Sequence, residues 1–160
     1  MSVKLGEADL GYLRMAVELS RSYRDVPGSW PFGAVLVARG EVVGRGFNQV
    51  AERRDPSAHA EIMALREAGR SLDRHEFPGS VLYSSAEPCP MCLAACYWAS
   101  VARIVYAATS RDLAGYDFSD LAIYAELRLP AGCRAVPEDV AGEGPRQDAL
   151  AAVREWAERR

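Results

Sequence analysis

The sequence lacks a long hydrophobic run. No apolar segment approaches the roughly 20 residues that a membrane-spanning helix needs, and residues 1–4 do not start the apolar core of a secretory signal. We therefore expect a cytoplasmic protein with no membrane partner. In that compartment the four cysteines are expected to be thiols or metal ligands rather than disulfides.

An excess of basic charge is also missing. The chain has 19 Lys and Arg against 22 Asp and Glu, a net charge of −3, and a pI of about 5.5. Surfaces that bind nucleic-acid phosphates normally carry a basic excess, so nucleic acid is not the expected partner. The sequence shows no repeats, low-complexity segments or interdomain linkers, so residues 1–160 are expected to form a single domain.

Hydrophobic periodicity and turn residues predict a layered α/β fold. Two apolar runs joined by Arg39-Gly40 are typical of an antiparallel hairpin. Pro56 suits the first position of a helix. The expected helices cover about residues 7–25, 56–69, 90–99, 121–127 and 146–158, and the expected strands residues 33–38, 42–47, 81–85, 103–108 and a short one near 134–136. We therefore predict a three-layer α/β/α sandwich with a mixed five-stranded sheet.

Two short motifs supply three metal-binding side chains. His59 and Glu61 stand near the start of one predicted helix, and Cys89 and Cys92 open another after a predicted strand. Three protein ligands leave the fourth position of a tetrahedral zinc free for water, which is typical of a catalytic site. The other histidine and the other two cysteines lie at no matching spacing. The sequence therefore predicts one zinc per chain, bound by His59, Cys89 and Cys92.

The position of Glu61 predicts its role. A helix N-terminus carries partial positive charge and favours thiolate over thiol, so two such ends help to assemble the zinc site and keep the metal acidic toward water. Glu61 stands beside the ligands without being needed as one. A carboxylate that moves protons must contact the water and the substrate rather than the metal, so Glu61 is the predicted general acid and base.

These motifs resemble the cytidine-deaminase-like superfamily, whose zinc deaminases share an H-x-E…P-C-x-x-C pattern. Within it, four segments resemble the bacterial guanine deaminase branch, and the resemblance extends over about residues 15–124. They are Pro31-Phe32-Gly33-Ala34, Asp55-Pro56-Ser57-Ala58-His59-Ala60-Glu61, Glu87-Pro88-Cys89-Pro90-Met91-Cys92-Leu93 and Tyr97-Trp98-Ala99. The resemblance implies the same zinc ligands, the same role for Glu61, and a homodimer whose C-terminal segments cover the partner's site.

The resemblance also implies substrate contacts. Asn48 is expected to hydrogen-bond the base, with Phe32, Ala60 and Trp98 around it. That branch ends in a tyrosine that reaches the base, whereas this chain ends Glu155-Trp156-Ala157-Glu158-Arg159-Arg160. The purine-reading contact is therefore expected either to be missing or to come from Asp117, Asp120 or Glu143. The expected reaction is hydrolytic deamination of a small base with release of ammonia, guanine first, with cytosine, other aminopurines and aminotriazines as alternatives.

Two other functions remain open at this point. Residues 59–66 equally resemble tRNA adenosine deaminases, but the acidic pI and the bulky Tyr97-Trp98 pair argue against an RNA loop entering the pocket. A non-catalytic zinc scaffold is the other alternative, and Glu61 argues against it. The same aromatic pair favours a homodimer formed in part by residues 92–100 and the strand 103–108.

Overall fold

The computed structural model describes residues 4–118 and 120–159. Its residues divide into two compact units, Met1–Ala122 and Ile123–Arg160. The first unit contains the sheet and the predicted metal ligands, and each unit is described separately.

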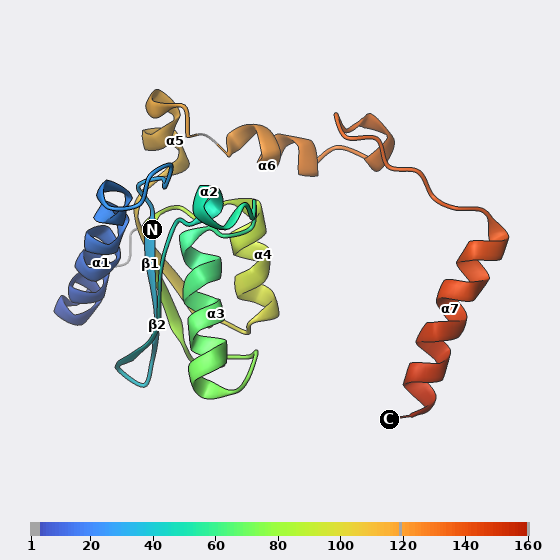
Figure 1. Cartoon of the computed structure of the whole chain (residues 1–160), viewed down its shortest axis with the longest axis horizontal. Helices are drawn as coiled ribbons and strands as arrows, with labels where there is room; N and C mark the ends of the chain where they lie inside the picture. Colours follow the sequence, from blue (N-terminus) through green and yellow to red (C-terminus); the bar gives the residue numbers. More distant parts are fainter. Residues whose placement is uncertain (1–3, 119, 160) are drawn as a thin grey trace. The chain divides into compact units, whose positions relative to one another are not determined.

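A mixed sheet of four strands forms the centre of the first unit (Figure 1). In the order β2-β1-β3-β4, the strands are β2 (Glu41–Phe47), β1 (Gly33–Ala38), β3 (Val81–Ala86) and β4 (Arg103–Ala108). β1 is antiparallel to both neighbours, and β3 and β4 are parallel. Arg39 and Gly40 both have positive φ, at 53° and 80°, as the two-residue turn of a hairpin requires.

Helices cover both faces of this sheet (Figure 1). α1 (Glu7–Leu19), which continues as the 3-10 helix η1 (Ser20–Arg24), packs on one face, where Ala16 meets Val35 and Tyr83. α3 (Ala60–Leu72) and α4 (Pro90–Trp98) cover the other, where Leu36 and Leu82 lie in a buried cluster. The predicted α/β class and the helical layers on both faces are confirmed.

Two glycines of β2 allow α3 to lie directly against the strand. A Cβ added at Gly44 would lie 2.2 Å from the carbonyl oxygen of Ala64, and one at Gly46 would lie 2.1 Å from that of Ala60. Carbon and oxygen cannot approach so closely, so any larger residue would push the helix away. Because Ala60 follows His59 directly, this contact also positions the predicted metal ligand.

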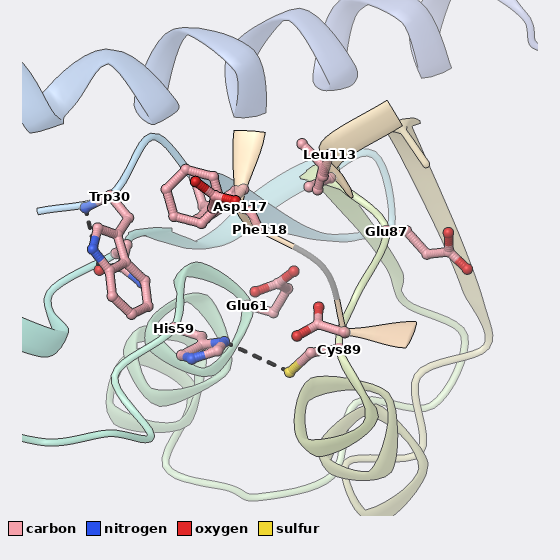
Figure 2. A pocket seen from close by; sticks show the side chains of 12 residues that line it. Trp30, His59, Glu61, Glu87, Cys89, Leu113, Asp117 and Phe118 are labelled. Atoms are coloured by element: carbon pink, nitrogen blue, oxygen red, sulfur yellow. Dashed lines mark hydrogen bonds between the residues drawn. The ribbon is translucent and has the colours of Figure 1, made fainter. Parts of the chain in front are cut away.

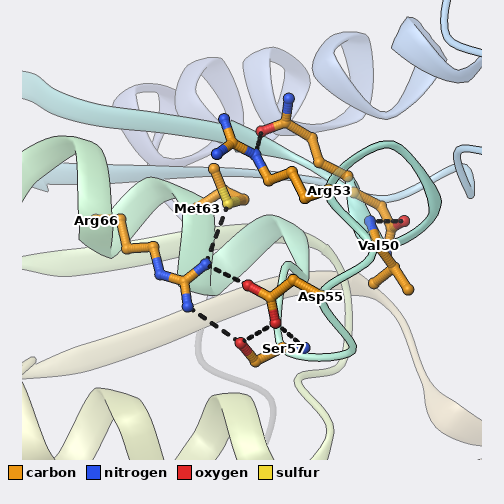
Figure 3. Close-up of polar contacts among 8 residues, drawn as sticks. Val50, Arg53, Asp55, Ser57, Met63 and Arg66 are labelled. Atoms are coloured by element: carbon orange, nitrogen blue, oxygen red, sulfur yellow. Dashed lines mark hydrogen bonds and ion pairs between the residues drawn. The ribbon is translucent and has the colours of Figure 1, made fainter.

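α3 begins later than the sequence predicted. The short helix α2 (Val50–Arg53) ends in the expected loop, and Pro56 lies in a turn rather than in the first turn of α3. The carboxylate of Asp55 accepts hydrogen bonds from the N–H and hydroxyl of Ser57, at 2.8 and 2.6 Å, and pairs with Arg66 at 3.0 Å (Figure 3). The prediction that Pro56 opens the helix is therefore wrong, because these contacts stabilise a turn there.

The predicted fifth strand is wrong as well. In the second unit, η3 (Ala131–Cys133) is followed by bends at 134–136. The N–H of Ala135 donates to the carboxylate of Glu126 at 2.7 Å, and Nε of Arg134 donates to the carbonyl of Leu129 at 3.2 Å. This segment is therefore held by local side-chain contacts instead of strand pairing, and the described residues form four strands, not five.

The remaining helices are short except for the last. α5 (Ser110–Leu113) and η2 (Ala114–Tyr116) follow β4, and α6 (Leu121–Leu127) has the predicted bounds. The second unit ends in α7 (Glu143–Glu158). Within the described ranges, none of the helices is long and apolar enough to cross a membrane.

Candidate active site

The predicted metal ligands meet where two helices begin. His59 is the N-cap residue of α3, Cys89 is the N-cap residue of α4, and Cys92 lies in the first turn of α4. Their ligand atoms all lie within 4.8 Å of one another, and Sγ of Cys89 is 3.6 Å from Nδ1 of His59 (Figure 2). Because α3 and α4 cover the same face of the sheet, their N-termini lie close together.

This donor set fits zinc. One imidazole and two thiols are preferred zinc ligands, and a tetrahedral site with ordinary bond lengths separates neighbouring donors by about 3.5–3.8 Å. The distance between Cys89 and His59 matches that separation. Among the described residues, no fourth His, Cys, Asp or Glu belongs to the group. The residues therefore fit a site with three protein ligands and one open position.

The pKa values of the three residues favour binding of a cation. A hydrogen bond with Cys92, followed by one with His59, lowers the pKa of the Cys89 thiol to about 4. The same contact with Cys89, together with burial, raises the pKa of Cys92, which keeps the proton that the pair shares. The hydrogen bond to Cys89 in turn raises the pKa of His59. A metal ion displaces such protons, because a coordinating thiol is deprotonated.

Glu61 is buried beside the group. It is the second residue of α3 and is 5% exposed. Its Oε1 accepts a hydrogen bond from the hydroxyl of Ser84 at 3.0 Å, and its Oε2 lies 3.4 Å from Sγ of Cys92. Burial raises the pKa of this carboxyl group. A raised pKa brings the carboxyl group closer to a proton-transfer role, in which it takes up a proton and releases it again.

A cavity of about 240 Å³ opens over these residues. Ligand pockets for drug-sized molecules are usually about 300–1,000 Å³, so this one suits a smaller molecule. Its lining consists of Trp30, Phe32, Asn48, His59, Glu61, Ala86, Glu87, Cys89, Leu113, Asp117, Phe118 and Asp120 (Figure 2).

Three aromatic rings form the apolar wall. Phe118 packs edge-on against Phe32, with ring centroids 5.2 Å apart and an interplanar angle of 87°. Its centroid also lies 5.9 Å from that of Trp30. Edge-to-face contacts of this kind are stabilising and fix the rings relative to one another. The wall therefore offers a preformed surface for a flat ring.

Asn48 contributes an unpaired donor. It is 1% exposed, and its Oδ1 accepts from the backbone N–H groups of Val50 at 3.3 Å and Trp30 at 3.5 Å. Its Nδ2 has no hydrogen-bond partner within the described part of the chain. A buried donor without a partner costs free energy, so an acceptor atom on a bound molecule would satisfy it.

The cavity is also lined by acidic side chains. Glu87, Asp117 and Asp120 join Glu61 in the lining, and none of the described lining residues is Lys or Arg. Burial raises the pKa of Asp120. Glu87 also accepts a hydrogen bond from the N–H of Ser110 at 2.8 Å. The cavity therefore favours molecules with N–H donors and disfavours anions.

Comparison with known proteins identifies the family. The zinc-binding region of cytidine and deoxycytidylate deaminases matches residues 7–108. The chain belongs to this family. It is 41% identical over 126 residues to the guanine deaminase of Bacillus subtilis, covering 79% of this chain and 81% of that protein. It is also 34% identical over 105 residues to the tRNA-specific adenosine deaminase of Aquifex aeolicus, covering 65% and 68%.

Solved structures of the family agree in fold. The X-ray structure of the Bacillus subtilis guanine deaminase aligns with a TM-score of 0.86 and 36% identity, over 94% of this chain and 95% of that one. A guanine deaminase of Nitrosomonas europaea aligns with a TM-score of 0.65 and 32% identity, over 74% and 68%. The protein is thus a guanine deaminase homologue with the cytidine deaminase fold, as the sequence motifs predicted.

Most of the predicted substrate-binding residues line the cavity. Phe32, Asn48, Asp117 and Asp120 line the cavity. Ala60 is buried in the first turn of α3 and is not part of the lining.

One predicted contact of the same unit is not part of the lining, and another belongs to the second unit. Trp98 ends α4 and is 84% exposed, because it lies six residues, or about 9 Å of helix, beyond Cys92. Glu143 is the first residue of α7 in the second unit.

Five lining residues were not predicted from the sequence: Trp30, Ala86, Glu87, Leu113 and Phe118. Three of them stood beside predicted ones. Trp30 precedes Phe32, Glu87 begins the cysteine motif, and Phe118 follows Asp117. Leu113 had no such signal, because it comes from a helix that the sequence pattern did not predict.

Proposed function

We propose that the protein is a zinc-dependent hydrolytic deaminase of a small amino-substituted base, guanine first. The observation that supports this most directly is one cavity that contains two of the three metal-binding side chains and a buried carboxylate, Glu61, outside the ligand group. The similarity to guanine deaminases of two bacteria supports the choice of base.

The residues of the site have distinct roles in the proposed reaction. His59, Cys89 and Cys92 hold the metal, and bound zinc supplies the Lewis acidity that makes water nucleophilic near neutral pH. Glu61 takes the proton from that water and delivers it to a ring nitrogen of the base. It then carries a second proton to the departing amino group, so that C–NH2 and water become C=O and ammonia. The burial of Glu61 suits it to alternate between both protonation states.

The lining supports a neutral base as the substrate. Nδ2 of Asn48 donates to an acceptor on the ring, and Asp117 or Asp120 accepts from a ring N–H. Guanine offers both kinds of group on one flat molecule. The carboxylates repel phosphate, so nucleotides are poor substrates. Trp30 and Phe118 join Phe32 around the base, and Trp98 and Glu143 remain further candidate contacts.

A homodimer is part of the same proposal. Tyr97 and Trp98 are 78% and 84% exposed on α4, beside the edge strand β4. Large exposed aromatic groups are typical of protein interfaces. A homodimer with α4 and β4 in its interface would remove the side chains of Tyr97 and Trp98 from water. The cytoplasmic location, the single domain and the covering of one site by the partner's C-terminal segment also remain predictions.

A panel of substrates tests the proposal. Ammonia release should be fastest with free guanine, with cytosine, 2,6-diaminopurine and an aminotriazine for comparison. Guanosine and cytidine should react at least tenfold more slowly, and a tRNA anticodon stem should not react. Release from the tRNA alone would instead favour the activity for which the Aquifex aeolicus relative is named. No release from any substrate by zinc-loaded protein would favour the scaffold.

A further inference from the structure

Ser84 is a polar residue in an apolar environment. It lies in β3 between Leu82 and Ala86 and is 1% exposed. Alternate residues of a strand share a face, so Ser84 points with Leu82 toward the side covered by α3 and α4. A hydroxyl buried there is unfavourable unless its hydrogen bonds are made. Its partners therefore indicate its role.

Both hydrogen bonds of Ser84 are made by buried groups. The backbone N–H of Ala86 donates to its Oγ at 3.4 Å, and its hydroxyl donates to Oε1 of Glu61 at 3.0 Å. Because an amide N–H can only donate, the hydroxyl proton remains available for the carboxylate. The sheet thus supplies one fixed hydrogen bond to a side chain of α3.

The two oxygens of Glu61 consequently have different surroundings. Oε1 is held by Ser84, whereas Oε2 lies 3.4 Å from Sγ of Cys92 in the metal-binding group. The last torsion of a glutamate side chain is broad and roughly two-fold, so covalent geometry alone does not decide which oxygen faces which way. The hydrogen bond from Ser84 removes that freedom.

We propose that Ser84 is a positioning residue for the deamination, because its hydroxyl holds Oε1 of Glu61 and thereby aims Oε2 at the reacting water and base. The inference rests on the proposed function, in which Glu61 carries the protons. Catalytic groups need to be held within about 0.5 Å and 10–20° of their productive geometry. A hydroxyl from a buried central strand is a rigid support for that purpose.

Ser80 provides a matched control. It precedes β3, is fully buried, and its Oγ has no hydrogen-bond partner among the described residues. Ser80→Ala and Ser84→Ala therefore delete the same buried hydroxyl from the same region. Only the second substitution removes a contact with Glu61, so the difference between the variants isolates positioning from core packing.

Steady-state kinetics on guanine, or on the panel base that the wild type turns over fastest, test the proposal. Ser84→Ala should lower kcat by roughly 10–10²-fold, a typical cost of misplacing a catalytic group, with KM within about twofold. Zinc content should match that of Ser80→Ala, both variants should stay folded at the assay temperature, and the kcat of Ser80→Ala should stay near wild type. Ser84→Thr keeps a hydroxyl on a β-branched side chain suited to a strand, and it should recover most of kcat.

A double substitution shows whether Ser84 acts through Glu61. In a Glu61→Gln background, Ser84→Ala should cause little further loss, because residues that act as a unit are not additive. Additive losses, a Ser84→Ala kcat equal to that of Ser80→Ala, or a loss of zinc or folding in Ser84→Ala would each overturn the proposal. If Glu61→Gln itself stays within tenfold of wild type, the proposed function fails instead.

Discussion

At the scale of single residues, Glu61 is the sharpest test of the chemistry. Glu61→Gln keeps the size and one hydrogen-bond acceptor of the side chain but removes its ability to transfer protons. We expect the variant to keep zinc and fold while kcat falls by at least ~10³-fold, since general acid–base catalysis is typically worth ~10²–10⁴ and this group makes several transfers. Steady-state kinetics on the best substrate measure kcat, and metal analysis measures the zinc content.

Glu67→Gln is the matched control for that prediction. It makes the same substitution on α3, where the carboxylate of Glu67 accepts from the N–H of Arg45 at 2.7 Å outside the cavity. Its kcat should remain near wild type. A Glu61→Gln enzyme that works within tenfold of wild type would show that another group moves the protons.

The lowered pKa of Asp55 predicts that the stability of the fold depends on pH. Hydrogen bonds from Ser57, and then from Arg66, lower the pKa of its carboxyl group to about 2 from the ordinary 3.8. A depressed pKa in the folded state means that the ionised form stabilises the fold above about pH 4, and that this contribution disappears as the pH falls toward 2. Asp55→Asn should therefore unfold more easily than wild type at pH 7.

Urea unfolding of both proteins between pH 7 and pH 2 measures this effect. The difference between their midpoints should be constant near neutral pH and should shrink below about pH 4. A difference that persists unchanged to pH 2 would contradict an ionised Asp55 as its source. The exposed position of the group makes the effect small and dependent on salt.

Residue identities also show how far the sequence could predict the site. The zinc group and Glu61 were predictable because their spacing places them at the starts of two helices. Trp30 and Phe118 were not, because they join the site through ring packing between loops that are distant in sequence. Trp98 is absent from the described lining for the converse reason, since a residue close in sequence to Cys92 lies a long way along the same helix.

At the scale of elements, local chemistry decided which predictions succeeded. Arg39-Gly40 predicted the hairpin turn, because two positive φ angles are what that turn needs. Pro56 misled, because its fixed φ suits a turn as well as a helix start, and the contacts of Asp55 with Ser57 favoured the turn. The outcome matters for the site, since a later start makes His59 the N-cap residue of α3.

The contact between β2 and α3 gives a prediction at this scale. Gly46→Ala would place a methyl group against the backbone of Ala60, next to His59. We expect a loss of about 1–3 kcal/mol or more in the free energy of unfolding, the usual cost of overpacking, together with weaker zinc binding. Thermal unfolding and metal titration measure these two effects.

Gly11→Ala is the control for this substitution. Gly11 lies in α1, and a Cβ there would meet no atom within 4 Å. Alanine favours helix over glycine by up to about 1 kcal/mol, so this variant should be slightly more stable and should bind zinc as wild type does. A Gly46→Ala protein that matches it in stability and zinc affinity would show that α3 can move away without consequence.

At the scale of the whole molecule, the sequence predicted the layers of the fold better than its edges. Helices and buried strands follow from hydrophobic periodicity within one segment. Whether a segment such as 134–136 joins a sheet depends on partners elsewhere in the chain, and here side chains of the same unit satisfied its polar groups instead. Assembly likewise depends on surfaces whose partner lies outside the chain.

Oligomeric state is therefore the prediction that belongs to this scale. Tyr97 and Trp98 expose large apolar surfaces on α4 next to β4, at the edge of the sheet. We expect light scattering at micromolar concentration to give the mass of a dimer. Trp98→Arg should shift the protein toward monomer, because a charge buried in an apolar interface without a partner is strongly unfavourable.

Tyr23→Arg, which changes an aromatic residue of η1 on the other face of the sheet, should remain dimeric. A wild-type protein that is monodisperse as a monomer would exclude this interface, and a dimer that tolerates Trp98→Arg would place the contact elsewhere.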